Sequence, residues 1–190
     1  MAAGLRKGKQ MELINTPKEH IPVFRELYGY AFPKNEQMPF DALLRRKEKG
    51  YLEFLSLTDD NEFIGMMVVA SHNDKVLLNY FAIDEKCRGG GYGSRALGLL
   101  KERIGDKHLF LDIELVTSDA PNLEQRERRK AFYMRNGFVQ TSLRFRMFGE
   151  RFEMLSDGQD IDIRTLRVML TKIFGKLAGL VLRFVLRPLK

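Results

Sequence analysis

Short helical and strand-like patterns of apolar residues alternate along the N-terminal part of the chain. Residues 11–14 (MELI) predict a short strand. Residues 17–30 predict a helix, because the proline at their start suits a first helical turn. Residues 32–39 (FPKNEQMP) follow the pattern of a loop, and residues 40–49 predict a second, charged helix that a glycine ends. This part of the chain therefore predicts one strand followed by two helices.

Three strand-like runs come next, at residues 51–58, 62–71 and 75–84. The first run alternates between apolar and polar residues, whereas the other two are apolar at nearly every position, as expected of central strands. Clusters of Asp, Asn and His separate the runs, and such clusters are typical of tight turns. Because the connections are short, we expect the three strands to form an antiparallel meander.

The apolar period changes after a glycine-rich segment at residues 87–93 (CRGGGYG). Residues 94–104 carry apolar residues at helical spacing, and residues 109–116 (LFLDIELV) predict another strand. Residues 123–135 predict a polar helix, and residues 138–155 predict a hairpin that turns at a Gly-Glu pair. The order of the elements predicts a mixed α/β (α+β) domain, with a mostly antiparallel, twisted sheet of about seven strands flanked by helices.

The last part of the chain, residues 160–187, predicts one added amphipathic helix. Its apolar residues share one face of the helical wheel: Leu166, Leu170, Ile173, Leu177, Leu180, Val181 and Phe184. Its basic residues include Lys172, Lys176, Arg183 and Arg187 on the opposite face. This pattern fits a membrane-surface helix, and it fits equally a helix that packs on its own domain or on a second copy in a homodimer. We expect a basic, disordered leader at residues 1–10, a domain at residues 11–158 and the amphipathic basic helix at residues 159–190.

The net charge of +7 is carried by the two ends of the chain. Residues 1–10 contribute +3 and residues 160–190 contribute +5, which leaves −1 for the residues between them. A body without a basic excess argues against a nucleic-acid partner. Because the chain has one cysteine, Cys87, no internal disulfide can form, and we expect neither a secretory signal nor a membrane-spanning helix. These features predict a cytoplasmic protein and leave peripheral attachment to a membrane open.

The segment from Leu77 to Leu100 carries the most informative chemistry in the sequence. A strand-like run leads into the glycine-rich turn, and the turn opens a helix. Glycine lets a backbone approach a phosphate closely, and a helix start offers unpaired N–H groups and the positive end of the helix dipole. The segment therefore predicts an anion site suited to a pyrophosphate.

Two common phosphate-binding motifs do not fit this loop. It lacks the Gly-Lys-Ser/Thr of a P-loop, and the spacing of Gly91 and Gly93 departs from the pattern of a dinucleotide site. The pattern Arg-x-x-Gly-x-Gly, formed by Arg88 and these two glycines, resembles the acetyl-CoA signature of the GCN5-related N-acetyltransferase (GNAT) superfamily. Residues 131–138 (AFYMRNGF) resemble the tyrosine-to-Gly-Phe motif of the same family. The resemblance covers about residues 11–155 and implies a GNAT-like fold.

The resemblance also implies a binding site for acetyl-CoA, with coenzyme A as the product. Backbone N–H groups of the loop would hold the pyrophosphate, and main-chain groups at the end of the preceding strand would bind the pantetheine arm and polarise the thioester carbonyl. The residues that it assigns to the cofactor are Phe81, Ala82, Ile83, Arg88, Gly89, Gly90, Gly91, Tyr92, Gly93, Ser94 and Asn122. At the usual place of the family's asparagine this chain has Arg126, so a helix cap is the alternative role for Asn122.

Two residues are implied in proton transfer. Glu114 is the candidate general base, acting directly or through a water, and Tyr133 is the candidate general acid that protonates the leaving thiolate. A surface carboxylate and a core tyrosine are the alternative interpretations. Glu36 is the candidate to bind the acceptor's ammonium group, and a solvent-exposed turn residue is the alternative. The three histidines are scattered, so we expect no metal site.

Two functions follow from these residues and remain open at the level of sequence. The first is a transferase, an acetyl-CoA-dependent N-acetyltransferase, in which a primary amine of a small molecule or peptide attacks the thioester directly. The second is a non-catalytic acyl-CoA-binding module with a GNAT fold, attached to a surface through its C-terminal helix. The two differ at Glu114 and Tyr133, because only the enzyme needs them. The sequence does not identify the acceptor amine or the oligomeric state.

Overall fold

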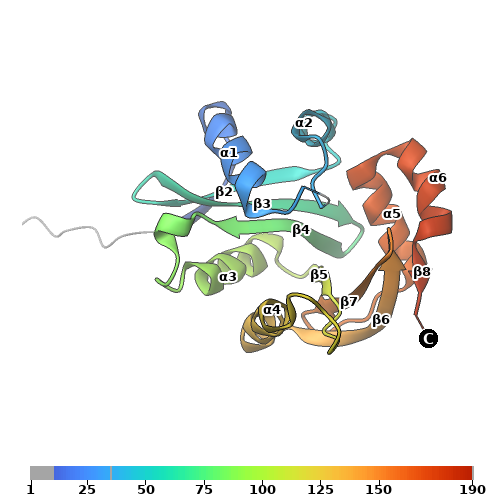
Figure 1. Ribbon diagram of the computed structural model, residues 1–190. Helices are drawn as coiled ribbons and strands as arrows, with labels where there is room; N and C mark the ends of the chain where they lie inside the picture. The colour runs from blue at the N-terminus through green and yellow to red at the C-terminus, as the bar shows by residue number, and fades with distance from the viewer. Residues whose placement is uncertain (1–10, 35, 190) are drawn as a thin grey trace, which may run out of the picture.

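One mixed sheet of eight strands organises residues 11–34 and 36–189, the part of the chain that the computed structural model describes (Figure 1). In chain order the strands are β1 (Met11–Asn15), β2 (Glu53–Asp59), β3 (Glu62–His72), β4 (Lys75–Ile83), β5 (His108–Glu114), β6 (Val139–Met147), β7 (Glu150–Ser156) and β8 (Arg187–Pro188). Their order across the sheet is β1-β2-β3-β4-β5-β7-β6-β8. The basic leader predicted at residues 1–10 lies outside the described residues.

The sheet is antiparallel except where β4 meets β5. The first four strands pair with their neighbours in chain order, which confirms the predicted meander. Asp60 and Asn61 connect β2 to β3 with φ angles of +52° and +67°, and both residue types tolerate such angles in a tight hairpin turn. β4 and β5 pair in parallel, because helix α3 (Tyr92–Ile104) returns the chain between them.

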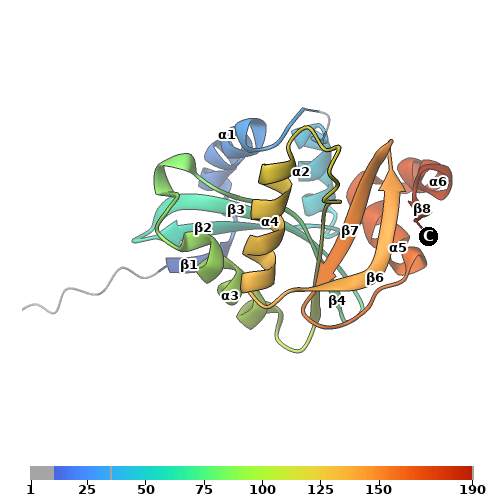
Figure 2. The same ribbon diagram turned by 60° about the horizontal axis from the view of Figure 1, so that its bottom comes forward.

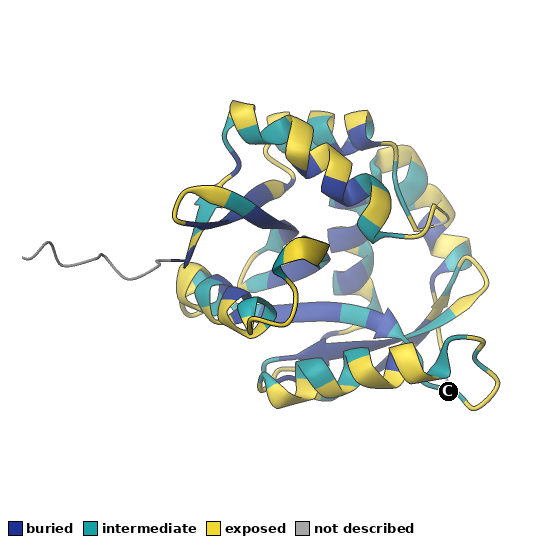
Figure 3. Ribbon diagram, turned by 60° about the vertical axis from the view of Figure 1, so that its left-hand side comes forward, coloured by how far each residue is buried: buried dark blue, intermediate teal, exposed yellow. Residues whose placement is uncertain are grey.

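Helices cover both faces of the sheet. On one face lie α1 (Ile21–Ala31), α2 (Phe40–Glu48), α5 (Ile163–Phe174) and α6 (Lys176–Val185). On the other lie α3 and α4 (Leu123–Arg135), which Figure 2 shows in front of the strands. Successive strand residues point to opposite faces of the sheet. Met66 is therefore buried in the core on the side of α1 and α2, and Met67 in the core on the side of α3. Figure 3 shows the result, with buried strands between helices whose outer faces are exposed.

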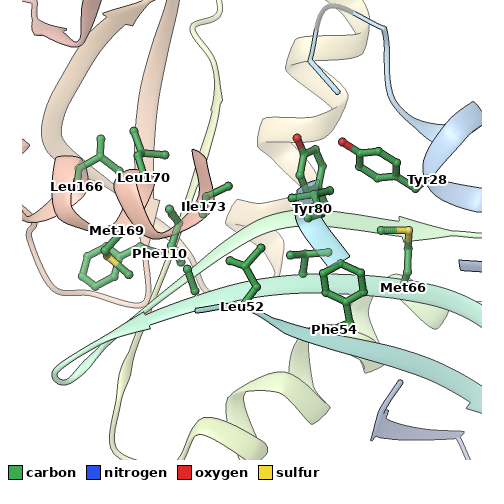
Figure 4. Packing of buried hydrophobic residues seen from close by; sticks show 14 of the residues in the cluster. Tyr28, Leu52, Phe54, Met66, Tyr80, Phe110, Leu166, Met169, Leu170 and Ile173 are labelled. Atoms are coloured by element: carbon green, nitrogen blue, oxygen red, sulfur yellow. The ribbon is translucent and has the colours of Figure 1, made fainter. Parts of the chain in front are cut away.

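The predicted elements match the structure closely, with one difference near the N-terminus. A short 3-10 turn at Lys18–His20 precedes α1, so the α-helix starts later than the proline at position 17 suggested. The side chains of α1 and α2 pack on β2 and β4. Figure 4 shows Tyr28 beside Tyr80, whose rings meet edge to face with centroids 4.9 Å apart. This packing places the loop between α1 and α2 next to β4.

The prediction of one helix over residues 160–187 is wrong. The chain forms two helices, α5 and α6, separated at Gly175, whose φ of +98° and ψ of +167° interrupt the helical hydrogen-bond ladder. Glycine adopts this conformation without steric cost. After the break the chain forms β8, which pairs with β6. No helix in the described part of the chain is long and apolar enough to span a membrane.

The break at Gly175 gives the two helices different surroundings. Leu166, Leu170 and Ile173 of α5 are buried in the core shared with α1 and α2, as Figure 4 shows. The following apolar residues of the predicted stripe are instead exposed on α6: Leu177, Leu180, Val181 and Phe184. The packing alternative is therefore correct for α5, whereas α6 keeps an apolar face in solvent.

β4 and β5 separate soon after they meet. Their parallel pairing runs only from Lys75 and His108 to Leu77 and Phe110. Two residues later the register of β4 against β3 shifts at Asn79, a β-bulge. Because a bulge bends its strand and ends regular pairing, it accounts for the divergence. The ends of β4 and β5 therefore form a fork in the middle of the sheet.

Candidate active site

The glycine-rich loop ends at the uncapped start of helix α3. Gly91 is the N-cap residue of α3 and has a φ of +71°. It has no side chain that could accept hydrogen bonds from the N–H groups of the first turn. Gly89 has φ of +88°. Both angles strain any residue that has a Cβ, so glycine suits both positions. A Cβ built on either residue meets no described atom within 4 Å, so the loop backbone faces open space with N–H groups available to an anion.

This loop borders a cleft of about 490 Å³. The cleft is lined by Ala31, Phe81, Ala82, Ile83, Cys87, Arg88, Gly89, Gly91, Tyr92, Gly93, Ser94, Arg129, Phe132 and Tyr133. The structure thus brings together the end of β4, the loop, the first turn of α3 and one face of α4. Most of the residues assigned from sequence to the cofactor lie here. Gly90 belongs to the same loop but does not line the cleft, because it turns toward the Tyr92 ring.

Tyr92 anchors the loop to the sheet. Its hydroxyl donates a hydrogen bond to Asp59 Oδ2 at the end of β2, with the two oxygens 2.5 Å apart. This hydrogen bond raises the pKa of the Tyr92 hydroxyl, which therefore stays protonated at neutral pH. The guanidinium of Arg95 lies 4.4 Å from the centre of the Tyr92 ring and covers it. These two contacts hold the first turn of α3 in place.

Tyr133 lies on α4 with its ring between Phe132 and Phe138, at centroid distances of 5.1 and 5.6 Å. Burial raises the pKa of its hydroxyl to about 12, although the nearby Arg129 guanidinium acts in the opposite direction. The hydroxyl is therefore protonated at neutral pH and suited to donate a proton inside the cleft. The Tyr133 ring packs against the core, and the residue also lines the cleft.

Glu114, at the end of β5, is held by two arginines of α4. Its Oε1 is 2.8 Å from Arg126 Nη2, and its Oε2 is 3.0 Å from Arg129 Nη1. Arg126 is only 8% exposed and donates further hydrogen bonds to the Leu115 carbonyl and to Asn122 Oδ1. Arg126 is therefore buried although the predicted helix around it is polar. Glu114 has a clear structural partner on each carboxylate oxygen.

Asn122 lies away from the cleft. It stands just before α4, at the end of the helix opposite to Tyr133, which the rise of an α-helix places roughly 16 Å away. Its side chain accepts from Arg126 Nε at 2.6 Å and does not cap the helix backbone. The structure therefore does not bring Asn122 to the residues assigned to the cofactor, and it also excludes the side-chain cap.

A second acid on β5, Asp112, interacts electrostatically with Glu36 of the loop between α1 and α2 and with Arg129 of α4. Burial raises the pKa of Asp112 to about 6, with a further contribution from the Glu36 carboxylate and an opposing one from Arg129. The Asp112 charge in turn affects Tyr133. A carboxyl group that titrates near neutrality can accept a proton and release it again.

Glu36 sits at the rim of the same region. Burial of its carboxyl group against the loop raises its pKa, and the Glu114 carboxylate raises it further, while Arg129 and Arg126 lower it. The residue as a whole is exposed to solvent. Its carbonyl accepts a hydrogen bond from the Tyr80 hydroxyl at 2.9 Å, which fixes the loop over β4. Tyr80 thus places a carboxylate at the open end of the fork.

Sequence reasoning missed several residues of this region. Asp112 was hidden in a strand-like run of apolar residues, where an isolated acid two residues before Glu114 was the available signal. Arg129 stands four residues before Tyr133, so the helical repeat places both on one face of α4. Ala31 and Cys87 reach the cleft only through the packing of α1 and the loop.

Comparison with known families decides the class of this fold. Residues 50–140 match the family described as "Acetyltransferase (GNAT) domain". The fold is that of the GNAT acetyltransferases. The match includes β2 to β5, the glycine-rich loop, α3 and α4, so it contains every element that lines the cleft except α1. No curated protein matches the chain.

Solved structures share the GNAT fold over most of the chain. A GNAT-family acetyltransferase from Bacteroides thetaiotaomicron is 24% identical, with a TM-score of 0.71, and the alignment covers 86% of this chain and 97% of that one. The ribosomal-protein-S18-alanine N-acetyltransferase from Escherichia coli is 16% identical, with a TM-score of 0.60 and coverage of 80% and 96%. The predicted GNAT-like fold is confirmed.

A third GNAT structure contains ligands. The spermidine N-acetyltransferase from Vibrio cholerae, solved in complex with CoA and spermine, is 13% identical, with a TM-score of 0.56 and coverage of 77% of this chain and 94% of that one. The solved structures that share the fold therefore include an enzyme named for an alanine of a ribosomal protein and one named for the polyamine spermidine.

Proposed function

We propose that this protein is an acetyl-CoA-dependent N-acetyltransferase that acetylates a primary amine of a small molecule or peptide. The main support is one cleft that brings three features together. They are the uncapped start of α3, the end of β4 that no longer pairs with β5, and Tyr133. Acetyl-CoA binding is supported by the GNAT domain and by the CoA complex of a relative.

The residues of the cleft fit the cofactor. The first-turn N–H groups at Tyr92, Gly93 and Ser94, with the positive end of the α3 dipole, suit the pyrophosphate. The exposed guanidinium of Arg88, whose Nη1 is 3.3 Å from Glu85 Oε1, stands at the loop's edge. Beyond Leu77 the end of β4 has no β5 partner, so its main-chain groups can bind an extended arm.

Acetyl-CoA supplies the activated acetyl group when it is bound, and the protein supplies binding, orientation and proton transfer. Tyr133 holds a proton on its hydroxyl at neutral pH and is the proposed general acid toward the leaving sulfur. On β5 we propose Asp112 as the proton acceptor, because its pKa of about 6 leaves it ionised but basic near pH 7. Glu114 remains a candidate base, although both its oxygens are already bound by guanidinium groups.

The acceptor side of the fork favours a cationic amine. Glu36 interacts electrostatically with both Glu114 and Asp112 of β5. Arg126 and Arg129 neutralise part of this charge by pairing with Glu114, which leaves Glu36 and Asp112 to attract an ammonium group. One structure that shares the fold is named for spermidine, a polyamine acceptor that carries such groups.

The proposal is tested by release of free thiol from acetyl-CoA across a panel of polyamines, amino sugars and peptides with free N-termini. Calorimetry of coenzyme A binding, run on the same preparation, separates binding from turnover. Binding together with amine-dependent thiol release supports the enzyme. Binding without release from any amine favours the alternative, a non-catalytic acyl-CoA-binding module. Absence of binding overturns both. The single cysteine fits a reducing compartment, and we propose the cytoplasm.

A further inference from the structure

The outward face of α6 is apolar. Leu177, Leu180, Val181 and Phe184 are 83%, 57%, 49% and 71% exposed, and their spacing places them side by side along the helix. The same helix turns Leu182 fully into the core, so it is firmly seated on the domain while its apolar stripe faces solvent. Single exposed apolar residues are common, but a contiguous stripe of this kind marks an interaction surface.

A cationic groove of about 400 Å³ runs beside this stripe, between α2, α5 and α6. Its lining includes five basic residues and no acidic one: Arg46, Arg167, Lys172, Lys176 and Arg183. Leu180, from the apolar stripe, lines the same groove. Charge and apolar surface are therefore continuous, and Figure 1 shows the three helices at one end of the molecule, with α6 outermost.

The groove is built by specific contacts rather than by flexible surface side chains. Arg46 donates from Nε to the Lys172 carbonyl at 2.7 Å and from Nη2 to the Thr171 carbonyl at 3.0 Å. Lys172 donates from Nζ to the Ser71 carbonyl on β3. α6 approaches α5 closely at Gly179, where an added Cβ would lie 2.8 Å from Thr171 Cγ2. These contacts hold the groove walls in a defined position.

Several of its cations lack a counter-charge. Arg167 Nε is buried without a hydrogen-bond partner in the described structure. Lys176 and Arg183 are exposed, and no ion pair within the described residues includes any residue of α5 or α6. Residues 163–190 contain seven Lys and Arg and no Asp or Glu. The surface therefore fits an anionic partner.

We propose that α5 and α6 dock the protein on the surface of an anionic membrane. The α6 stripe of Leu177, Leu180, Val181 and Phe184 inserts at the boundary of headgroups and acyl chains, as apolar faces of interfacial helices do. The groove and rim cations bind lipid phosphates, since basic residues near an anionic leaflet add to the binding free energy. A second copy fits less well, because two α6 faces in contact would bring two sets of unpaired cations together.

The test uses the full chain and vesicles of phosphatidylcholine, with or without phosphatidylglycerol. Removal of residues 160–190 would uncover the core around Leu166 and Leu170, so exposed residues are substituted instead. We expect sedimentation with the anionic vesicles only. Phe184→Gln and Leu177→Gln each lower the partition coefficient about tenfold through lost apolar burial. Lys176→Gln and Arg183→Gln each lower it about fivefold.

Two matched control variants lie away from this end. Met134→Gln removes an exposed apolar residue from α4, on the opposite face of the sheet, and Lys107→Gln removes a cation between α3 and β5. We expect both control variants to bind anionic vesicles as well as the wild-type protein does. Equal binding to neutral vesicles overturns the preference for an anionic membrane, and anionic binding that Phe184→Gln leaves unchanged overturns insertion. Dimers in sedimentation velocity that Phe184→Gln dissociates, without any vesicle binding, assign the face to a second copy and overturn the membrane proposal.

Discussion

The Tyr92 hydroxyl donates to Asp59 Oδ2, and this hydrogen bond ties the first turn of α3 to the end of β2. Asp59 is only 8% exposed, and its other oxygen, Oδ1, is buried without a hydrogen-bond partner in the described structure. The carboxylate therefore depends on Tyr92. Through this contact a residue of the loop is coupled to the stability of the sheet.

Tyr92→Phe is expected to lower the free energy of unfolding by about 1 to 3 kcal/mol, because it leaves a buried carboxylate oxygen unpaired. The affinity for coenzyme A should fall as well, since the start of α3 loses an anchor. Urea unfolding and calorimetry measure the two effects. Tyr51→Phe is the control, because the ring of Tyr51 stays under Arg46 without its hydroxyl. Equal effects of the two substitutions would contradict the role of the Tyr92 hydroxyl.

Gly93→Ala is expected to weaken coenzyme A binding about tenfold through overpacking at the cleft wall. A Cβ at this position would lie 3.1 Å from Cζ of Phe132, whose ring lines the cleft and would have to move. The matched control is Gly98→Ala in the same helix, where a Cβ meets no described atom within 4 Å. The control should raise stability by about 1 kcal/mol through helix propensity and keep the affinity. Calorimetry and thermal unfolding of both variants check this pair of outcomes.

Asp112→Asn is expected to stabilise the protein near neutral pH. The pKa of Asp112 is raised from its ordinary value of 3.8 to about 6, so the folded state binds the proton more tightly than the unfolded state. Stability from this group is therefore present at low pH, declines as the pH rises between these two values and stays lower above them. The substitution removes this penalty, at most about 3 kcal/mol at pH 7 and above.

Unfolding by urea from pH 4 to pH 8 measures this dependence. Asp162→Ala is the opposite control, because hydrogen bonds from the Thr165 and Arg164 N–H groups at the start of α5 lower the pKa of Asp162. Loss of that helix cap should cost about 1 kcal/mol at neutral pH. If Asp112→Asn destabilises the protein at pH 7, the raised pKa of Asp112 is refuted. Thiol release by the same variant tests its separate role as proton acceptor, and Glu114→Gln is the comparison.

Tyr133→Phe is expected to lower turnover about a hundredfold, the usual contribution of a general acid, while the affinity for coenzyme A stays close to that of the parent protein. The ring keeps its contacts with Phe132 and Phe138, so stability should change little. Steady-state kinetics and calorimetry on one preparation separate the two effects. Unchanged turnover would leave Tyr133 with a packing role only.

Local patterns determined most of the fold and the location of the candidate cofactor site. Strand and helix periods depend on residues two to four positions apart, so β1 to β7 and α1 to α4 follow from the sequence within a few residues. The glycine-rich loop likewise carries its own conformation, because Gly89 and Gly91 are suited to positive φ. A family resemblance added Tyr133, and the structure places it across the cleft from that loop.

Tertiary structure alone decided which charges are buried and where the apolar face of the C-terminus points. Arg126 looked like a surface residue because its helix is polar, and it is buried because β5 places Glu114 opposite it. Asp112 titrates near neutrality because the fold buries its carboxyl group, and Glu36 of a distant loop adds a smaller contribution. The stripe on α6 is exposed because the turn at Gly175 rotates it away from the core that α5 covers. In each case the deciding contact joins segments far apart in the chain, which no local pattern records.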